Sequence, residues 1–217
     1  ILLRMGLPTD RTLAVVLAAG GGSRFDGPDH KLLARIDGGP VARAAIRHAL
    51  DADIGPVLVV TGAVDLSELL DGLERRRGRD GSAESPSRLR RVHNERWAHG
   101  QATSLQLAVA EARRRDADAI VVGLADQPFI EPEAWRRVAA SEAAIAVATY
   151  DGARRNPVRL HRSVWPLLPA EGDDGARIVT RLHPELVEAV PSPGSPADID
   201  TLEDLASWQN RSSTNSP

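Results

Sequence analysis

Short apolar runs rich in valine and isoleucine alternate with longer amphipathic segments along this chain. The apolar runs predict strands over residues 13–18, 57–61, 89–93, 119–124, 144–149, 158–161 and 186–190. Helical periodicity between them predicts helices over residues 41–51, 66–77, 102–115, 132–141, 176–183 and 201–209. Strands that alternate with helices are typical of a parallel sheet whose connections cross over through helices. The pattern therefore predicts an α/β fold.

Two interruptions of the pattern refine this prediction. Pro157 stands just before a predicted strand, and proline is tolerated at the start or edge of a sheet better than in its middle. We therefore expect the later strands to form an antiparallel flank on a mostly parallel sheet. The polar segment 79–87 is typical of a surface loop. These boundaries predict a single domain over residues 12–208, with an N-terminal extension over 1–11 and a polar, disordered tail over 209–217.

Composition limits the classes of function. The chain has 217 residues, enough for one well-buried domain and few for two. A net charge of -3 gives no general attraction for nucleic acid, and the absence of cysteine excludes disulfides and thiolate metal sites. No apolar run approaches the roughly 18 residues that a membrane-spanning helix needs. We expect a soluble, cytoplasmic protein that binds small molecules rather than nucleic acid or membranes.

A glycine-rich loop with an unusual lysine follows the first predicted strand. Lys31 is the only lysine among 27 basic residues, and a compact ammonium suits crowded phosphate oxygens better than a planar guanidinium does. Glycines at 20–22 let backbone N–H groups approach an anion closely, and Arg24 adds positive charge. These features indicate a phosphate-binding loop. The alternatives are a surface lysine and an ordinary flexible turn, because the loop is not a P-loop and Phe25 replaces the third glycine of a dinucleotide fingerprint.

Ligands of open parallel sheets collect at the carboxyl ends of the strands, so the residues that follow each strand should face one cleft. This rule selects residues 18–31, Thr61 with Gly62, the segment 94–104 that begins with Asn94, and residues 125–128. Gly100, Gln101 and Ser104 stand where a helix begins, and free N–H groups and polar side chains there can bind a nucleobase or a ribose. Helix capping by Thr103 or Ser104 is the alternative.

Asp126 follows the hydrophobic run 120–124 (IVVGL), which predicts a buried central strand that delivers a carboxylate to the cleft edge. Magnesium prefers one or two protein carboxylates, with water and substrate phosphates as its other ligands. Asp198 and Asp200 alternate along an extended segment, so one of them should face the cleft. We therefore expect Asp126 and either Asp198 or Asp200 to bind Mg²⁺. The alternative is that Asp200 or Thr201 only caps the helix that follows.

Taken together, the motifs are far more specific than any one of them. They are residues 17–20 (LAAG) with Arg24 and Lys31, 100–105 (GQATSL), 126–128 (DQP), 156–158 (NPV), 172–177 (GDDGAR) and 198–201 (DIDT). In their order and spacing the chain resembles the nucleotidyltransferases that complete the molybdenum cofactor, most closely the molybdenum cofactor cytidylyltransferases. The resemblance implies a Rossmann-like, three-layer sandwich. It also implies transfer of a nucleoside monophosphate from a nucleoside triphosphate, with release of pyrophosphate.

The resemblance implies roles for individual residues as well. Arg24 and Lys31 would hold the triphosphate and act with Asp126 as catalytic residues. Together with the residues at the strand ends, the expected substrate-binding residues are Ala18, Ala19, Gly20, Gly21, Gly22, Ser23, Thr61, Gly62, Asn94, Gly100, Gln101, Ser104, Asn156, Pro157 and Arg177. Arg177 would meet a pterin phosphate on the acceptor side. Ala19 stands where the guanylyl enzymes of the family carry glycine, and its methyl group near the base disfavours a purine, which favours CTP.

The leading hypothesis is therefore Mg²⁺-dependent transfer of CMP from CTP to molybdopterin or the molybdenum cofactor, with a molybdoenzyme or its chaperone as a candidate partner. Alternatives within this chemistry are GTP as the donor, and a sugar phosphate or another phosphorylated small molecule as the acceptor. A nicotinamide-dependent oxidoreductase and a non-catalytic pterin-binding module are hypotheses from other classes. The chain departs from the family pattern after Arg24, where Asp26 and Asp29 add two carboxylates beside the expected triphosphate site.

Overall fold

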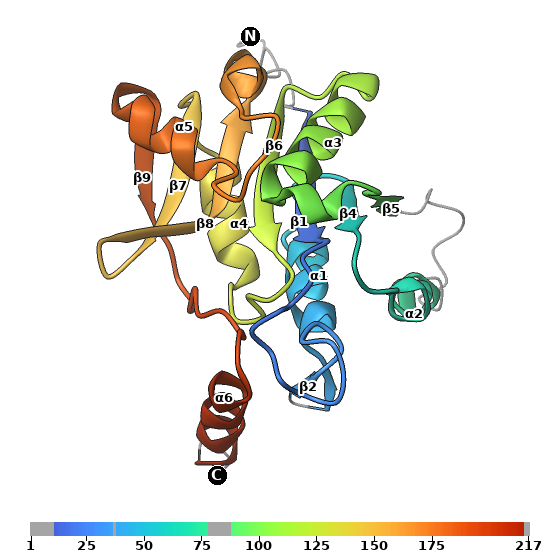
Figure 1. Ribbon diagram of the computed structural model, residues 1–217. Coiled ribbons are helices and arrows are strands. Elements are labelled where there is room, and N and C mark those ends of the chain that lie inside the picture. Colours follow the sequence, from blue (N-terminus) through green and yellow to red (C-terminus); the bar gives the residue numbers. More distant parts are fainter. Residues whose placement is uncertain (1–10, 37, 78–87, 215–217) are drawn as a thin grey trace, which may run out of the picture.

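A computed structural model of the protein describes residues 11–36, 38–77 and 88–214 (Figure 1). The predicted surface loop 79–87 lies outside the described residues, as do residues 1–10 of the predicted N-terminal extension and the final residues 215–217. No helix among the described residues is both long and apolar enough to cross a bilayer.

A seven-stranded sheet forms the centre of the molecule. Its strands, in spatial order, are β5 (Leu89–His93), β4 (Val57–Thr61), β1 (Thr12–Ala18), β6 (Ala119–Leu124), β8 (Ala153–His161), β7 (Ile145–Tyr150) and β9 (Val187–Pro191). All neighbours pair in parallel except β8, which is antiparallel to both β6 and β7. The predicted mostly parallel sheet is confirmed, and its antiparallel part is the single strand β8.

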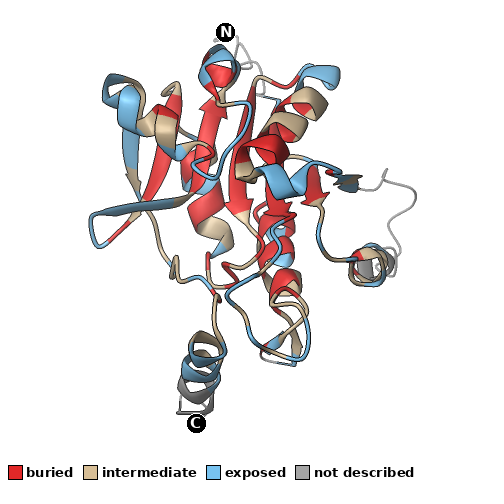
Figure 2. Cartoon of the chain, viewed as in Figure 1, coloured by how far each residue is buried: buried red, intermediate tan, exposed pale blue. Residues whose placement is uncertain are grey.

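Helices cover both faces of this sheet. On one face lie α1 (Val41–Asp51), α2 (Ser67–Arg77) and α4 (Pro132–Ala139), and on the other lie α3 (Gln101–Arg114) and α5 (Arg177–Leu182). Ile46 and Trp135 pack in the core of the first face, and Leu105 and Val179 pack in the core of the second. Because both faces are covered, every residue of β1 is buried (Figure 2). The molecule is the expected three-layer sandwich.

Strand β8 begins earlier than the sequence predicts, at Ala153 instead of residue 158. Its pairing with β7 shifts register at this point, because Val147 pairs with Val158 while the next residue of β7 pairs with Arg155. Pro157 therefore falls in a β-bulge, where its missing N–H costs no ladder hydrogen bond. The proline marks an irregularity inside the strand and not the start of the strand.

Several short elements escape prediction from the pattern. They are the hairpin of β2 (Arg35–Ile36) and β3 (Gly39–Pro40), and the 3-10 helices η1 (Trp97–His99), η2 (Arg162–Leu167) and η3 (Pro184–Leu186). The last helix, α6 (Leu202–Thr214), stands apart from the other helices and continues beyond its predicted end at residue 209, so the segment predicted as a tail begins as helix. Trp208 anchors α6 by stacking on Phe129, with 3.8 Å between ring centroids.

Candidate active site

The loop that follows β1 is closed by His30. Its Nδ1 accepts a hydrogen bond from the Leu32 N–H (3.2 Å), and its Nε2 lies 3.1 Å from the Gly20 carbonyl oxygen. With Nδ1 as the acceptor, the neutral ring carries its proton on Nε2 and donates it to Gly20. Burial, helped by the nearby Lys31 charge, lowers the pKa of His30 and keeps the ring neutral at neutral pH. Gly22 permits this closure, because its φ is +62° and a Cβ there would lie 3.0 Å from His30 Nε2.

Lys31 lies between two carboxylates at the end of this loop. Its Nζ is 2.6 Å from Asp126 Oδ2, just after β6, and 2.7 Å from Asp200 Oδ1, just before α6. The other oxygen of Asp200 contacts an Arg24 guanidinium nitrogen at 2.9 Å. Burial alone lowers the pKa of the Lys31 ammonium, but the carboxylates of Asp126 and Asp200 outweigh burial and raise that pKa above its usual value. The ammonium is therefore charged throughout the neutral pH range.

At the start of α6, one residue contacts Lys31 and two others cap the helix. The Thr201 N–H donates to Asp204 Oδ2 (2.9 Å), and the Asp204 N–H donates to Thr201 Oγ1 (3.1 Å). This capping box satisfies the first turn of the helix. Thr201 and Asp204 therefore cap the helix, and the Asp200 carboxylate is available for Lys31.

Asp198 lines the same cavity as Asp200, so the expectation that only one of the two aspartates would face the cleft is wrong. Residues two apart in an extended chain lie on the same side, and the buried Ile199 between them lies on the other. Its Oδ1 accepts a hydrogen bond of 2.7 Å from Gln127 Nε2, and Gln127 Oε1 accepts one of 3.0 Å from Asn156 Nδ2. Burial first, and then repulsion from Asp126, raises the pKa of Asp198. The two aspartates therefore lie in different surroundings, Asp200 beside the loop and Asp198 beside β8.

The Asp126 and Asp200 carboxylates fit a divalent cation. Asp126 Oδ1 is buried and finds no hydrogen-bond partner among the described residues, although buried carboxylate oxygens are normally bonded. Across that same part of the chain, no three His, Cys, Asp or Glu side chains gather into a metal site of their own. Magnesium needs only one or two protein carboxylates when phosphates and water supply its other ligands. The pair meets that requirement, with Lys31 as its counter-ion.

Two adjoining cavities open beside the Asp126 and Asp200 carboxylates. The loop cavity, of about 350 Å³, is lined by the predicted residues Ala18, Gly20, Gly22, Ser23, Arg24, Lys31, Asp126 and Asp200. The central cavity, of about 580 Å³, is lined by Ala19, Gly20, Gly21, Ser23, Arg24, Gly100, Gln101, Ser104, Asp126, Arg177, Asp198 and Asp200. Asp126 and Asp200 line both. The exposed Asp26 and Asp29 line neither, so the two additional carboxylates of the loop lie outside these cavities.

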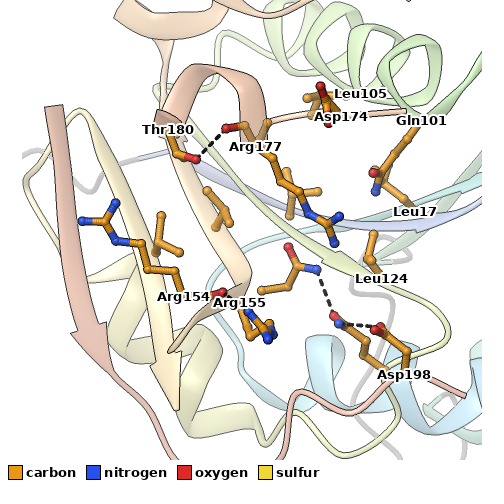
Figure 3. A pocket seen from close by; sticks show the side chains of 17 residues that line it. Leu17, Gln101, Leu105, Leu124, Arg154, Arg155, Asp174, Arg177, Thr180 and Asp198 are labelled. Atoms are coloured by element: carbon orange, nitrogen blue, oxygen red, sulfur yellow. Dashed lines mark hydrogen bonds between the residues drawn. The ribbon is translucent and has the colours of Figure 1, made fainter. Parts of the chain in front are cut away.

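A third cavity, the flank cavity of about 520 Å³, opens beside β8 (Figure 3). Its apolar walls are Leu17, Leu105, Val122, Leu124, Val147 and Val158, and its polar residues include Gln127, Arg154, Arg155 and Asn156. Figure 3 shows Arg177 reaching into this cavity from the start of α5. Two charged residues, Arg177 and Asp198, line both the flank cavity and the central cavity. The two cavities therefore adjoin beside these two side chains.

A family model described as "MobA-like NTP transferase domain" matches residues 14–189, which run from β1 to β9 and make up more than half of the chain. The chain belongs to this family. It is therefore an enzyme, a nucleotidyltransferase, as the glycine loop beside a carboxylate pair suggests. No curated protein matches the chain significantly.

Solved structures share the fold of this MobA-like transferase. Rv0371c from Mycobacterium tuberculosis is 25% identical, with a TM-score of 0.72 over 93% of this chain and 99% of that one. A nucleotidyl transferase from Methanothermobacter (Mth528) is 22% identical, with a TM-score of 0.75 over 95% and 100% of the two chains. The inositol-1-phosphate CTP transferase of T. maritima is 15% identical, with a TM-score of 0.69 over 94% and 96%. The nucleotidyltransferase fold thus extends over nearly the whole chain.

Some predicted residues of this MobA-like transferase lie apart from the three cavities. Thr61 and Gly62 line a separate cavity of about 400 Å³ beside β5. A Cβ at Gly62 would lie 2.8 Å from the Cβ atoms of both Ala19 and Trp97, so these two side chains cover the end of β4. Pro157 lines none of the three cavities, because it occupies the bulge beside Asn156.

Asn94 also lies outside the three cavities and has a supporting position. It is buried, and its Nδ2 donates hydrogen bonds of 2.9 Å to Thr103 Oγ1 and to Ser104 Oγ. Thr103 in turn donates to the Gly100 carbonyl (2.9 Å). These bonds hold the start of α3 and the segment before it, so Asn94 positions Gly100 and Ser104 at the central cavity.

The structure adds residues that the sequence reasoning missed. His30 closes the loop, Gln127 connects Asn156 with Asp198, Arg154 and Arg155 line the flank cavity, and Asp173 lines both the loop cavity and the central cavity. The sequence contained a signal for two of these residues, Gln127 and Asp173. Both stand inside motifs that carry the family resemblance, at 126–128 and 172–177. The expected roles in these motifs concerned only Asp126 and Arg177.

Replacing Gly100 by alanine should destabilise the protein by about 1–3 kcal/mol, since its φ is +99° and an added Cβ would lie 2.4 Å from Gly172 C. The Ala102 N–H donates to the Gly172 carbonyl (2.9 Å), so the variant also displaces two segments that frame the central cavity. We expect nucleotide affinity to fall roughly tenfold to a hundredfold. Urea unfolding and calorimetric nucleotide titration measure the two effects.

The control for this variant is Gly72→Ala on α2. An added Cβ at Gly72 meets nothing within 4 Å, and alanine is the better helix former, so this change should be neutral or stabilising by up to about 1 kcal/mol. Equal stability and equal nucleotide affinity of the Gly100→Ala and Gly72→Ala proteins would contradict the role given to Gly100.

Proposed function

We propose that this nucleotidyltransferase transfers CMP from CTP to the terminal phosphate of molybdopterin or the molybdenum cofactor, and releases pyrophosphate. An oxygen of the acceptor phosphate attacks the α-phosphorus of CTP in line, while the bond from that phosphorus to the bridging oxygen of pyrophosphate breaks. Because the attacking group is already anionic, neither a general base nor a covalent enzyme intermediate is needed. The enzyme must align two anionic substrates and neutralise their charge.

The observation that carries this proposal is the convergence of Lys31, Asp126 and Asp200 where the loop cavity meets the central cavity. The Lys31 Nζ lies within 2.7 Å of both carboxylates, and Arg24 adds a second cation at Asp200. Backbone N–H groups of the glycine loop complete a cradle for anions. A triphosphate in the loop cavity would place its sugar and base in the central cavity, beside Gly100, Gln101 and Ser104.

Asp126 and Asp200 would hold Mg²⁺, which when bound neutralises charge on the phosphate oxygens. Asp198 is less suitable because Gln127 already holds it and burial raises its pKa. The structure of Rv0371c in complex with manganese, 24% identical to this chain with a TM-score of 0.66, supports a divalent ion in this fold. Removal of divalent ions with a chelator should therefore abolish turnover and leave the fold intact.

The flank cavity would hold the acceptor. Its leucine and valine walls match a flat ring system better than a sugar, which supports molybdopterin over a sugar phosphate. Arg177 lies on the boundary with the central cavity, where it would neutralise the acceptor phosphate. The bulge at Asn156 shapes the β8 side of this cavity. The nucleotide product would then pass to a molybdoenzyme or its chaperone.

The test of this proposal is calorimetric titration of CTP, GTP, ATP and UTP with Mg²⁺, followed by pyrophosphate assays across acceptors. We expect tightest binding of CTP, and pyrophosphate release that depends on molybdopterin or molybdenum cofactor. A preference for GTP, or turnover with a sugar phosphate but not with molybdopterin, would replace the donor or the acceptor. Tight NAD binding without CTP binding would overturn the proposal as a whole.

Replacing Ala19 by glycine should raise the kcat/KM ratio of GTP to CTP by roughly tenfold, since one methyl group in a pocket is worth about 10–200-fold in discrimination. Ala19 is buried against Gly62 and lines the central cavity, so the change enlarges that cavity. Steady-state kinetics with both nucleotides measure the ratio. In the control Ala18→Gly, the same methyl group is removed at the loop cavity, and the ratio should stay within about twofold of wild type. Equal ratios in both variants would exclude Ala19 from donor selection.

A further inference from the structure

In the protein alone, Lys31 neutralises the two carboxylates that the proposed function assigns to the metal. Its contacts of 2.6 Å to Asp126 and 2.7 Å to Asp200 are charge-assisted hydrogen bonds, and its side chain is only 11% exposed. Two carboxylates this close repel each other unless a cation lies between them. Lys31 thus makes the electrostatic contribution that a divalent ion would make in the same place.

The same ammonium cannot neutralise the carboxylate pair and the donor phosphates at once. A divalent ion at Asp126 and Asp200 would add two positive charges beside Lys31, and repulsion at such short range is strong in a partly buried site. A triphosphate brings negative charge into the loop cavity, which Lys31 also lines. Exchange of Lys31 for a metal ion is therefore favourable when phosphates are present to receive the ammonium.

The surroundings of Lys31 suit such an exchange. A Cβ at Gly22 would lie 3.3 Å from Lys31 Cγ, so the lysine stem passes close to the glycine loop. Arg24 contacts only the outer oxygen of Asp200 and is 75% exposed, so it cannot replace Lys31 between the carboxylates. A flexible stem with a compact charge can move between neighbouring anions, whereas a guanidinium fork needs more room. This explains why one lysine stands here in a chain that otherwise uses arginine.

We propose that Lys31 is a built-in counter-ion that keeps divalent metal out of the Asp126–Asp200 pair until the nucleotide arrives. Metal and nucleotide then bind together, and the lysine passes from the carboxylates to the donor phosphates. The inference rests on the proposed function for its metal assignment. If it holds, the Lys31 side chain alone determines that metal does not bind before the nucleotide.

The test is a titration of the full chain with Mn²⁺ in the absence of nucleotide. The EPR signal of free Mn²⁺ measures how much of the ion is bound. Lys31→Met removes the competing ammonium, so it should bind Mn²⁺ roughly tenfold more tightly than wild type or better. Lys31→Arg keeps the charge and should stay within about threefold of wild type. Arg24→Gln removes an equal charge at the rim of the site and should tighten binding by less than about threefold.

Two results would overturn the inference. One is Mn²⁺ binding by Lys31→Met that is no tighter than wild type, and the other is equal tightening by Arg24→Gln, which would show a general charge effect. Circular dichroism checks that each variant is folded, and Lys31→Gln serves for the same comparison if Lys31→Met does not fold. A different result would contradict the proposed function, namely that the wild-type protein does not bind CTP in the presence of Mg²⁺. The comparison of Mn²⁺ affinities between the variants could still be made in that case.

Discussion

Replacing Asp126 by asparagine should lower turnover by roughly two to four orders of magnitude, the range expected when a preorganised electrostatic contact at a reacting phosphate is lost. Asparagine keeps the size of the side chain but removes its charge. The Lys31 ammonium, now 2.6 Å from Asp126 Oδ2, would lose its nearer carboxylate, and half of the proposed metal-binding pair would be gone. The loss corresponds to about 3–5 kcal/mol of transition-state stabilisation.

Pyrophosphate release at saturating CTP, Mg²⁺ and acceptor measures this effect. Asp26→Asn provides a matched control, because Asp26 is exposed on the loop after β1 and lines neither the loop cavity nor the central cavity. Its turnover should stay within about twofold of wild type, as for most surface substitutions. Pyrophosphate release at the wild-type rate by Asp126→Asn would remove Asp126 from the catalytic residues.

The fold follows from the sequence wherever apolar runs have clear ends. Strands β4, β5 and β6 and helix α1 begin and end at the predicted residues. Strand β6 has no polar side chain, and β4 has only Thr61 at its end, as expected for strands buried on both faces. Helix α1 carries an unbroken buried stripe that starts directly after Pro40. In β4, β6 and α1 local pattern and tertiary burial demand the same structure, whereas β5 (LRRVH) is largely exposed.

Prediction fails where the structure depends on pairing instead of pattern. The strands β2 and β3 have two residues each, too few to show any periodicity. The first half of β8 is exposed and polar, and it forms a strand because β7 offers it hydrogen bonds on the far side of the bulge at Pro157. Neither feature leaves a signal in the hydrophobicity of its own residues.

In the candidate site, too, local sequence predicts some features, and others depend on residues distant in sequence. The rule that ligands gather at strand ends places Asp126 and the glycine loop together, as the structure does. The rule is too coarse for Thr61, because the side chains of Ala19 and Trp97 cover the end of β4. Our preference for Asp200 over Asp198 as the proposed metal ligand depends on a contact of Asp200 with a lysine 169 residues away in sequence. Spacing alone cannot decide between two residues when the deciding partner is that distant.

Replacing Lys31 by alanine should lower turnover by roughly two to four orders of magnitude, because the donor phosphates lose their buried cation. Lys31→Arg should restore little of that turnover, since a planar guanidinium suits crowded phosphate oxygens less well than a compact ammonium does. Single-turnover release of pyrophosphate measures the chemical step apart from product release. Wild-type turnover of either variant would remove Lys31 from the catalytic residues.

Lys31 is also the residue for which two measurements should move in opposite directions. Loss of its ammonium should tighten Mn²⁺ binding in the absence of nucleotide, because the Asp126–Asp200 pair loses its competitor, and should slow turnover, because the phosphates lose their cation. A purely structural lysine would weaken both, since a disordered loop holds neither carboxylates nor phosphates in place. Tighter metal binding with slower turnover in one variant therefore separates a side chain that exchanges partners from one that only supports the loop.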